Sequence, residues 1–240
     1  MEYAILLAVA LAAGTLGGVV GTGSSMVLMP FLVVLFGPKH AVPIMAIAAI
    51  LGNLGRVIAW RRLVDWRAVA AYSATAIPGA ALGVRSLLAL PARAVDVALG
   101  LFFVSMILAR RWFARHELHV TRLHLALVGG PIGFLTGIVV STGPLSVPIF
   151  LAYGLEKGAF LSTEAAASLA IYCAKIVTFR ASGALPVEIV AKGLLCGSAV
   201  MAGAFVGRHL VLRMSTEMFK HVLDGVMLVS GASLLWAAVR

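Results

Sequence analysis

The sequence contains two apolar segments that are too long to cross a membrane once and too short to cross it twice. They span residues 3–36 and 122–154, about 33 residues each, whereas a hydrocarbon core about 30 Å thick takes about 20 helical residues. Glycine interrupts each near its middle, at residues 21–25 (Gly-Thr-Gly-Ser-Ser) and 141–144 (Ser-Thr-Gly-Pro). Since glycine releases helical geometry and proline removes a backbone donor, each segment is predicted to be two helices joined by a non-helical break at membrane depth.

The rest of the chain is also apolar. Hydrophobic residues make up 62% of the 240 positions and charged residues only 12%, which excludes an ordinary soluble domain. We therefore predict an all-α polytopic membrane protein that is embedded in the lipid bilayer. No Lys or Arg precedes the first segment, so we expect it to belong to the mature fold rather than to a signal peptide. The other apolar segments are 42–60, 68–90, 94–110, 160–179, 186–207 and 218–238.

The net charge of +10 does not indicate nucleic-acid binding. Most of the positive charge lies in short loops between the apolar segments, where membrane insertion places it. Cys173 and Cys196 both lie inside apolar segments, so we interpret them as small packing residues rather than as a disulfide or a metal site.

Glycines and prolines recur after about 120 residues in the same order. The nearly constant offset predicts a duplication, with a first membrane repeat at residues 1–115 and a second at 116–240. The matching pairs are Gly18 and Gly137, Gly23 and Gly143, Pro30 and Pro148, Gly79 and Gly203, Gly83 and Gly207, and Gly100 and Gly225.

The distribution of basic residues predicts the topology. If each broken segment turns back as a hairpin, eleven basic residues lie in inner loops and five in outer loops; if each crosses once, the split is nine to seven. The positive-inside rule favours the hairpins. Each repeat is then a broken helical hairpin plus three transmembrane helices, and the odd number of net crossings gives two inverted-topology repeats, a plan that recurs in secondary transporters. The eleven are Arg61, Arg62, Arg67, Arg110, Arg111, Arg115, Arg122, Lys157, Arg208, Arg213 and Lys220.

The paired breaks are the predicted binding site. The exposed amides at the N-terminus of a half-helix, together with nearby hydroxyls, can hold an anion, and paired interrupted segments indicate a transport site. The alternative is that these small residues only permit close helix packing. The candidates are Thr22, Gly23, Ser24 and Ser25 in the first break and Ser141, Thr142 and Gly143 in the second.

Two basic residues lie within apolar segments at equivalent places. Arg56 follows Pro30 by 26 residues, and Lys175 follows Pro148 by 27. An intramembrane charge is costly and usually faces a cavity or a partner, so both are candidates for neutralising a bound oxyanion. Arg56 alternatively snorkels to the inner headgroups. Asn53 either binds the substrate or satisfies a neighbouring helix.

Several acidic and polar residues carry weaker hypotheses. Thr163 is a candidate substrate ligand, while Ser162 or Thr163 alternatively caps the helix that follows. Glu164, and less so Asp96 and Asp224, could carry a coupling proton. No nucleophile elbow, metal-ligand spacing or nucleotide loop is present in the sequence, so we expect no enzyme activity, no metal and no cofactor.

The sequence resembles the TauE/SafE family of sulfite-exporter-like anion permeases over nearly its whole length. The resemblance rests on the glycine-containing break followed by Pro30 and Gly37, and on residues 143–148 (Gly-Pro-Leu-Ser-Val-Pro), 154–157 (Gly-Leu-Glu-Lys), Thr163 and Lys175. The first break departs from the glycine-rich run of the family. The resemblance implies movement of sulfite, a sulfonate or a related organosulfur anion across the bacterial inner membrane.

Together these observations predict a secondary transporter of a small anion that works by alternating access, without nucleic acid as a partner. An anion channel and a membrane binding protein without transport are the alternatives. The sequence leaves a homodimer open.

Overall fold

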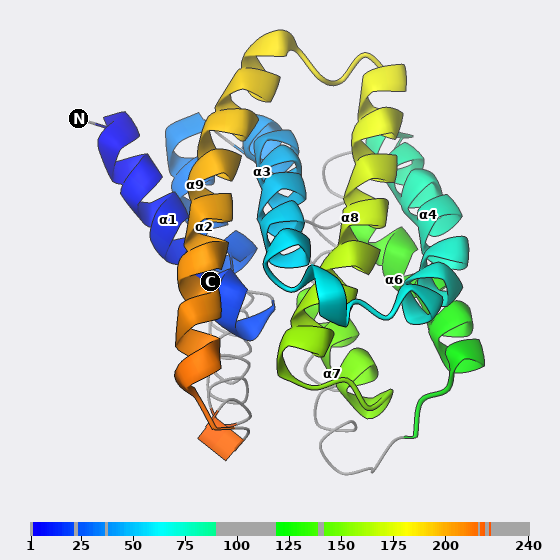
Figure 1. Ribbon diagram of the computed structural model, residues 1–240. Helices are drawn as coiled ribbons and strands as arrows, with labels where there is room; N and C mark the ends of the chain where they lie inside the picture. Colours follow the sequence, from blue (N-terminus) through cyan, green and yellow to red (C-terminus); the bar gives the residue numbers. More distant parts are fainter. Residues whose placement is uncertain are drawn as a thin grey trace, which may run out of the picture.

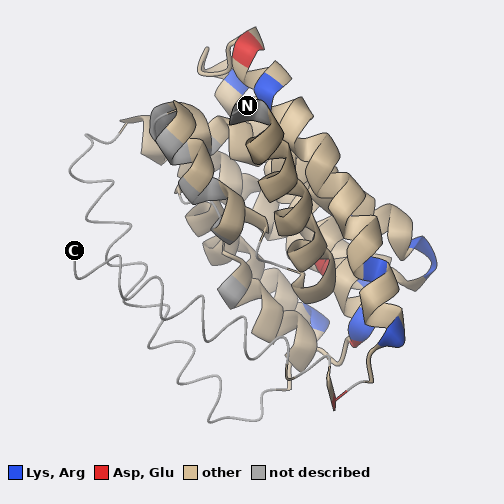
Figure 2. Ribbon diagram, turned by 90° about the vertical axis from the view of Figure 1, so that its left-hand side faces the viewer, with Lys and Arg blue, Asp and Glu red and all other residues tan. Residues whose placement is uncertain are grey.

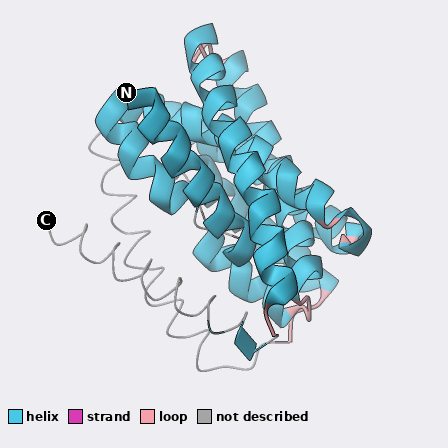
Figure 3. Cartoon of the chain, turned by 60° about the vertical axis from the view of Figure 1, so that its left-hand side comes forward, coloured by secondary structure: helices cyan, strands magenta, loops and turns pink. Residues whose placement is uncertain are grey.

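The computed structural model describes residues 2–21, 24–36, 38–89, 119–138, 142–215, 217, 218 and 221. This part of the chain folds into helices and contains no strand (Figures 1 and 3), as predicted. The helices are α1 (Glu2–Val20), α2 (Ser24–Phe36), α3 (Pro38–Ala59), α4 (Trp66–Ala89), α6 (Arg122–Ile138), α7 (Gly143–Ala152), α8 (Lys157–Ala181) and α9 (Val187–Arg213), with a 3-10 turn, η1, at Arg61–Leu63.

Both predicted breaks are confirmed. The first long segment divides between α1 and α2, and the second between α6 and α7. Pro144 occupies the first turn of α7, where its missing N–H would have had no helical partner. The predicted segment at 94–110 and most of that at 218–238 lie outside the described residues.

The two helices of each broken segment lie side by side. The amide of Val120, just before α6, donates to the carbonyl of Ala152 at the end of α7 over 3.2 Å. At the other break a Cβ on Gly17 would lie 3.2 Å from that of Ser24, so α2 turns back along α1. The two described helices of each broken segment therefore form a hairpin.

The described α-helices form two groups of four (Figure 1). Helices α1, α2, α3 and α9 share one buried core, which includes Leu6, Leu28, Ile44 and Val200. Helices α4, α6, α7 and α8 form most of the second core, around Tyr72, Leu125, Phe150 and Phe160. Each group thus combines three consecutive helices with one helix from the other half of the chain.

Glycines bring helices into backbone contact in both groups. A Cβ on Gly14 of α1 would lie 2.2 Å from the carbonyl oxygen of Val200 in α9, and a Cβ on Gly133 of α6 would lie 2.2 Å from that of Ala76 in α4. Gly133 stands 119 residues after Gly14, and Val200 stands 124 residues after Ala76. The same offsets relate the contact of Gly18 with Ala204 to that of Gly137 with Ala80. The repeated glycines of the sequence therefore make repeated contacts in space.

One end of the bundle is tied together by polar contacts and carries most of the described basic residues (Figure 2). Lys157 Nζ donates to the carbonyl of Met214 at 3.3 Å, and the Tyr153 hydroxyl donates to Asp65 at 3.2 Å. These contacts join the start of α8, the end of α9, the end of α7 and the linker before α4. The basic residues there are Arg61, Arg62, Arg67, Arg122, Lys157, Arg208 and Arg213.

The sides of the bundle are apolar. Large hydrophobic side chains stand exposed on several helices, among them Leu82, Leu127, Val177 and Leu194. Such an extended exposed apolar surface is typical of contact with lipid rather than with water. By length and composition, α8 and α9 can each cross a membrane. The fold is consistent with a membrane protein.

The glycine contacts predict different outcomes for two substitutions on α6. Gly133→Ala is expected to lower the stability by about 1–3 kcal/mol, because a methyl group there overpacks against the backbone of α4. Gly130→Ala is the matched control, since its Cβ would meet Thr75 at an ordinary 3.6 Å and alanine favours the helix. Thermal unfolding in detergent measures both, and a Gly133→Ala variant as stable as Gly130→Ala would contradict the packing.

Candidate functional site

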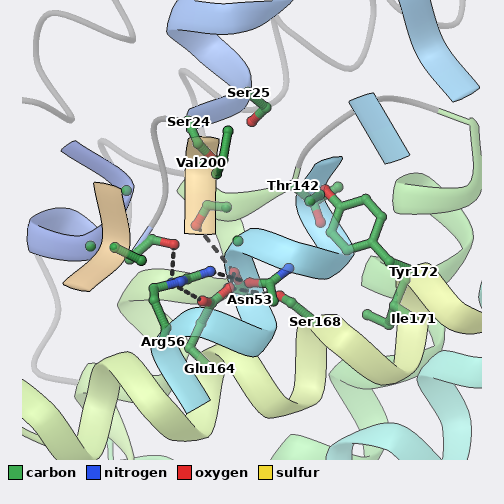
Figure 4. A pocket seen from close by; sticks show the side chains of 18 of the residues that line it. Ser24, Ser25, Asn53, Arg56, Thr142, Glu164, Ser168, Ile171, Tyr172 and Val200 are labelled. Atoms are coloured by element: carbon green, nitrogen blue, oxygen red, sulfur yellow. Dashed lines mark hydrogen bonds and ion pairs between the residues drawn. The ribbon is translucent and has the colours of Figure 1, made fainter. Parts of the chain in front are cut away.

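A cavity lies between the two helix groups at the level of both breaks (Figure 4). Its empty space is about 630 Å³, including its open mouth. Gly21 lines it at the first break and Thr142 at the second, so the structure brings the two breaks together. Of the predicted site residues, those that line the cavity are Ser24, Ser25, Asn53, Arg56, Thr142 and Gly143.

The guanidinium of Arg56 is buried in this cavity. Its Nη1 donates to the carbonyl of Gly21 and, at 2.9 Å, to Oε2 of Glu164, while Nη2 donates to Oδ1 of Asn53. Figure 4 shows these contacts converging from α3, α8 and the first break. Arg56 is 8% exposed, so the snorkelling interpretation is wrong: the side chain finds its acceptors inside the bundle.

Gly21 makes this arrangement sterically possible. Its φ of +85° lies in the left-handed region of backbone conformation, which residues other than glycine rarely adopt. A Cβ at this position would also lie 3.1 Å from the Phe160 ring and 3.4 Å from Arg56 Nη1. The end of α1 thus turns its last carbonyl toward the guanidinium without a side chain in the way.

Glu164 is the second charged residue of the site. Its Oε2 accepts from Arg56, and its Oε1 accepts from the hydroxyls of Ser168 at 2.8 Å and Ser146 at 3.4 Å. The carboxylate is buried, with an ionic partner on α3 and hydroxyl donors on α7 and on α8. Desolvating such a pair offsets much of its attraction, but removing one partner leaves an uncompensated buried charge.

Hydroxyls and two helix N-termini supply the rest of the polar lining. Ser24 and Ser25 open α2, and Thr142 and Gly143 open α7, so the positive ends of both helix dipoles reach the cavity. The hydroxyl of Thr142 bonds to that of Thr136 at 2.5 Å. The amides, the hydroxyls and the Arg56 guanidinium are suited to an oxyanion, although the guanidinium is paired with the Glu164 carboxylate here.

Tyr72 is a lining residue that the sequence did not indicate. It lies on α4 with its ring 5.2 Å from that of Phe150. Its hydroxyl is buried and has no hydrogen-bond partner within the described part of the chain. A buried donor without a partner is rare, and a bound water or a ligand would satisfy it. A tyrosine in an apolar segment carries no sequence signal of this role. Ser146 also lines the cavity, and it did have a sequence signal, because it lies within the Gly-Pro-Leu-Ser-Val-Pro motif at residues 143–148.

Other predicted residues lie outside the cavity lining. Lys175 is fully buried, and its Nζ donates to the carbonyl of Thr136 at 2.9 Å, which places it one contact behind the lining. Thr163 accepts from the amide of Asp65 at 2.9 Å. The capping interpretation of Ser162 and Thr163 is wrong, because α8 already begins at Lys157. Thr22, Gly23, Ser141, Asp96 and Asp224 lie outside the described residues.

Comparison with known proteins identifies the family. The family model described as sulfite exporter TauE/SafE matches residues 6–234, which confirms the resemblance seen in the sequence. The searches of curated proteins and of solved structures gave no match.

The buried pair predicts a non-additive effect of two substitutions. Arg56→Gln is expected to cost about 3 kcal/mol of stability, because it leaves the Glu164 carboxylate buried without its cation. The double variant Arg56→Gln/Glu164→Gln removes both charges and should recover a large part of that loss. Thermal unfolding in detergent measures both. A double variant less stable than Arg56→Gln alone would show that the pair is not coupled.

Proposed function

The chain belongs to the sulfite exporter TauE/SafE family, and on this basis we propose that it is a secondary transporter of a small anion. Membership supports a membrane transporter rather than an enzyme. The finer proposal is that sulfite, a sulfonate or a related organosulfur oxyanion crosses the bacterial inner membrane by alternating access. The observation that carries it is the Arg56 guanidinium, buried between two helix breaks in a cavity lined by hydroxyls and helix N-termini.

The chemistry of this lining favours an oxyanion. A guanidinium presents donors in a planar fork that matches the oxygens of a sulfonate or sulfite group. In the proposed complex, Arg56 and Asn53 hold one side of the anion, and the hydroxyls and amides at residues 22–25 and 141–143 hold the other. The hydroxyl of Tyr72 donates a further hydrogen bond to the anion. Lys175 contributes charge from behind Thr136, and Thr163 holds the backbone just before α4 through the amide of Asp65.

The proposed scaffold is a pair of inverted-topology repeats, residues 1–115 and 116–240. The repeated glycine contacts support it, as do the hairpins α1–α2 and α6–α7, which occupy equivalent places in the two halves. Because α9 packs with α1 to α3 and α4 packs with α6 to α8, the bodies that rock against each other are these two groups rather than the two sequence halves. The cavity lies between them, as alternating access requires.

The proposed orientation places the end that carries Arg61, Arg62 and Arg67 in the cytoplasm, in a multi-pass arrangement. The enrichment of basic residues there supports it. An anion channel is the alternative mechanism. It differs in that its flux does not saturate with anion concentration.

Transport is testable in proteoliposomes with labelled sulfite and methanesulfonate. Saturable uptake is expected, and Arg56→Ala should lower kcat/KM by about tenfold or more, because it removes a charge-assisted contact to the anion. Lys175→Ala should have a smaller effect, since Lys175 lies behind the lining. Arg61→Ala, at an exposed arginine outside the cavity, is the control. Absence of uptake for all such anions, or unchanged uptake by Arg56→Ala, would reject this proposal.

Tyr72→Phe separates a ligand-binding role from a structural one. Because the hydroxyl has no partner among the described residues, its removal should not lower the stability of the empty protein. It should raise KM by about five- to tenfold, the value of one hydrogen bond. Tyr153→Phe, which removes a hydroxyl at the end of the bundle, is the matched control for uptake. Loss of stability without a change in KM would assign Tyr72 to packing alone.

A further inference from the structure

Glu164 occupies the position at the Arg56 guanidinium that an anionic substrate requires. Its carboxylate is itself an anion, tethered to α8 and bound to Nη1 of Arg56 at 2.9 Å. We propose that Glu164 couples the movement of one anion to that of one proton. The carboxylate pairs with Arg56 when the site is empty, and it takes up a proton and releases Arg56 when a substrate anion binds. This inference rests on the proposed transport function.

The charge of the cavity is the physical reason. Among the described lining residues, Arg56 carries a positive charge and Glu164 a negative one, so the empty site is neutral. A bound monoanion would leave one uncompensated negative charge in a buried site, which is costly. Uptake of one proton by Glu164 restores neutrality. The empty site and the loaded site then carry the same charge.

Other titratable groups near Glu164 do not supply this compensation. Tyr72 on α4 and Tyr172 on α8 line the cavity and are neutral in both states. The described lining residues of α1, α2, α6, α7 and α9 are glycine, serine, threonine, valine and alanine. Lys175 lies three turns further along α8, where its Nζ donates to the Thr136 carbonyl. On α3, Arg56 is the cation to which the anion binds in place of the Glu164 carboxylate.

The surroundings of Glu164 satisfy both of its protonation states. Ser168 and Ser146 donate to Oε1 of the carboxylate. A hydroxyl can also accept a hydrogen bond, so a protonated Glu164 can donate to one of the same serines after a rotation of the hydroxyl. A site built only of cationic donors would not allow this.

The proposed cycle conserves charge and atoms. On one side of the membrane an anion binds to Arg56 and one proton binds to a Glu164 oxygen. After the helix groups rock, both leave on the other side and the carboxylate returns to Arg56. For a monoanion the net movement is electroneutral. By linkage, anion binding promotes proton uptake, and a proton already on Glu164 promotes anion binding by the same factor.

The test uses the full chain in proteoliposomes containing an internal pH dye, with methanesulfonate as the probe because it stays ionised at every pH used. An inward methanesulfonate gradient should acidify the interior. Its flux should be insensitive to a potassium diffusion potential. On the alkaline side, the apparent affinity should fall about tenfold per pH unit, as one linked proton requires.

Three variants sharpen the result. Glu164→Gln should abolish the anion-driven acidification and make the apparent affinity independent of pH, whereas Glu164→Asp, which keeps a titratable group, should retain acidification. Glu188→Gln, at an exposed glutamate paired with Lys192, should behave as the wild type. Methanesulfonate uptake by the wild type without acidification, or acidification that survives Glu164→Gln, would overturn the coupling but not the transport function. No uptake of either sulfite or methanesulfonate would reject both.

Discussion

The buried guanidinium of Arg56 needs several hydrogen-bond acceptors at once. The rest of the site depends on the residues that supply them. One acceptor is the Gly21 carbonyl, which becomes available because α1 ends there. The second is Asn53, one turn earlier on α3, and the third is Glu164 on α8. The break is therefore a structural requirement as well as a binding feature. Without it, Arg56 would lack a backbone partner, and an unsatisfied buried charge is strongly destabilising.

Close backbone packing keeps the cavity from collapsing. In each group a broken hairpin packs against a helix from the other half of the chain. Glycines allow the close contact of α1 with α9 and of α6 with α4. Such contacts bring backbones together and leave little freedom to slide, because cores resist added volume. Apolar residues also pack between the groups, because Val19 and Val20 of α1, with Trp60 just after α3, belong to the core of the second group. The cavity lies in the polar part of this boundary, around Arg56 and Glu164.

Much of the fold follows from local sequence signals, and much of the site does not. The breaks could be predicted because glycine and Pro144 act on their own backbone. The repeated spacing related Gly18 to Gly137, but it did not indicate which helices these glycines contact. Arg56 and Asn53 could be named because a charge and an amide are rare in apolar helices. The role of Glu164 as the partner of Arg56 could not, since the two stand 108 residues apart. Tyr72 was missed because its importance lies in a missing partner, which only packing reveals.

The two halves of the chain share helix contacts but differ in their charged site residues. This difference matters for the proposed coupling of protons to anions. Lys175 stands 119 residues after Arg56, yet it lies behind the lining while Arg56 lies in it. At the same offset, the counterpart of Glu164 is Met45, a fully buried apolar residue. The described part of the site therefore holds one exchangeable carboxylate rather than two. A duplicated backbone could supply two carboxylates as easily as one, so it does not set the number of protons that accompany each anion. That number follows from a single side chain, and the scaffold and the coupling can change independently.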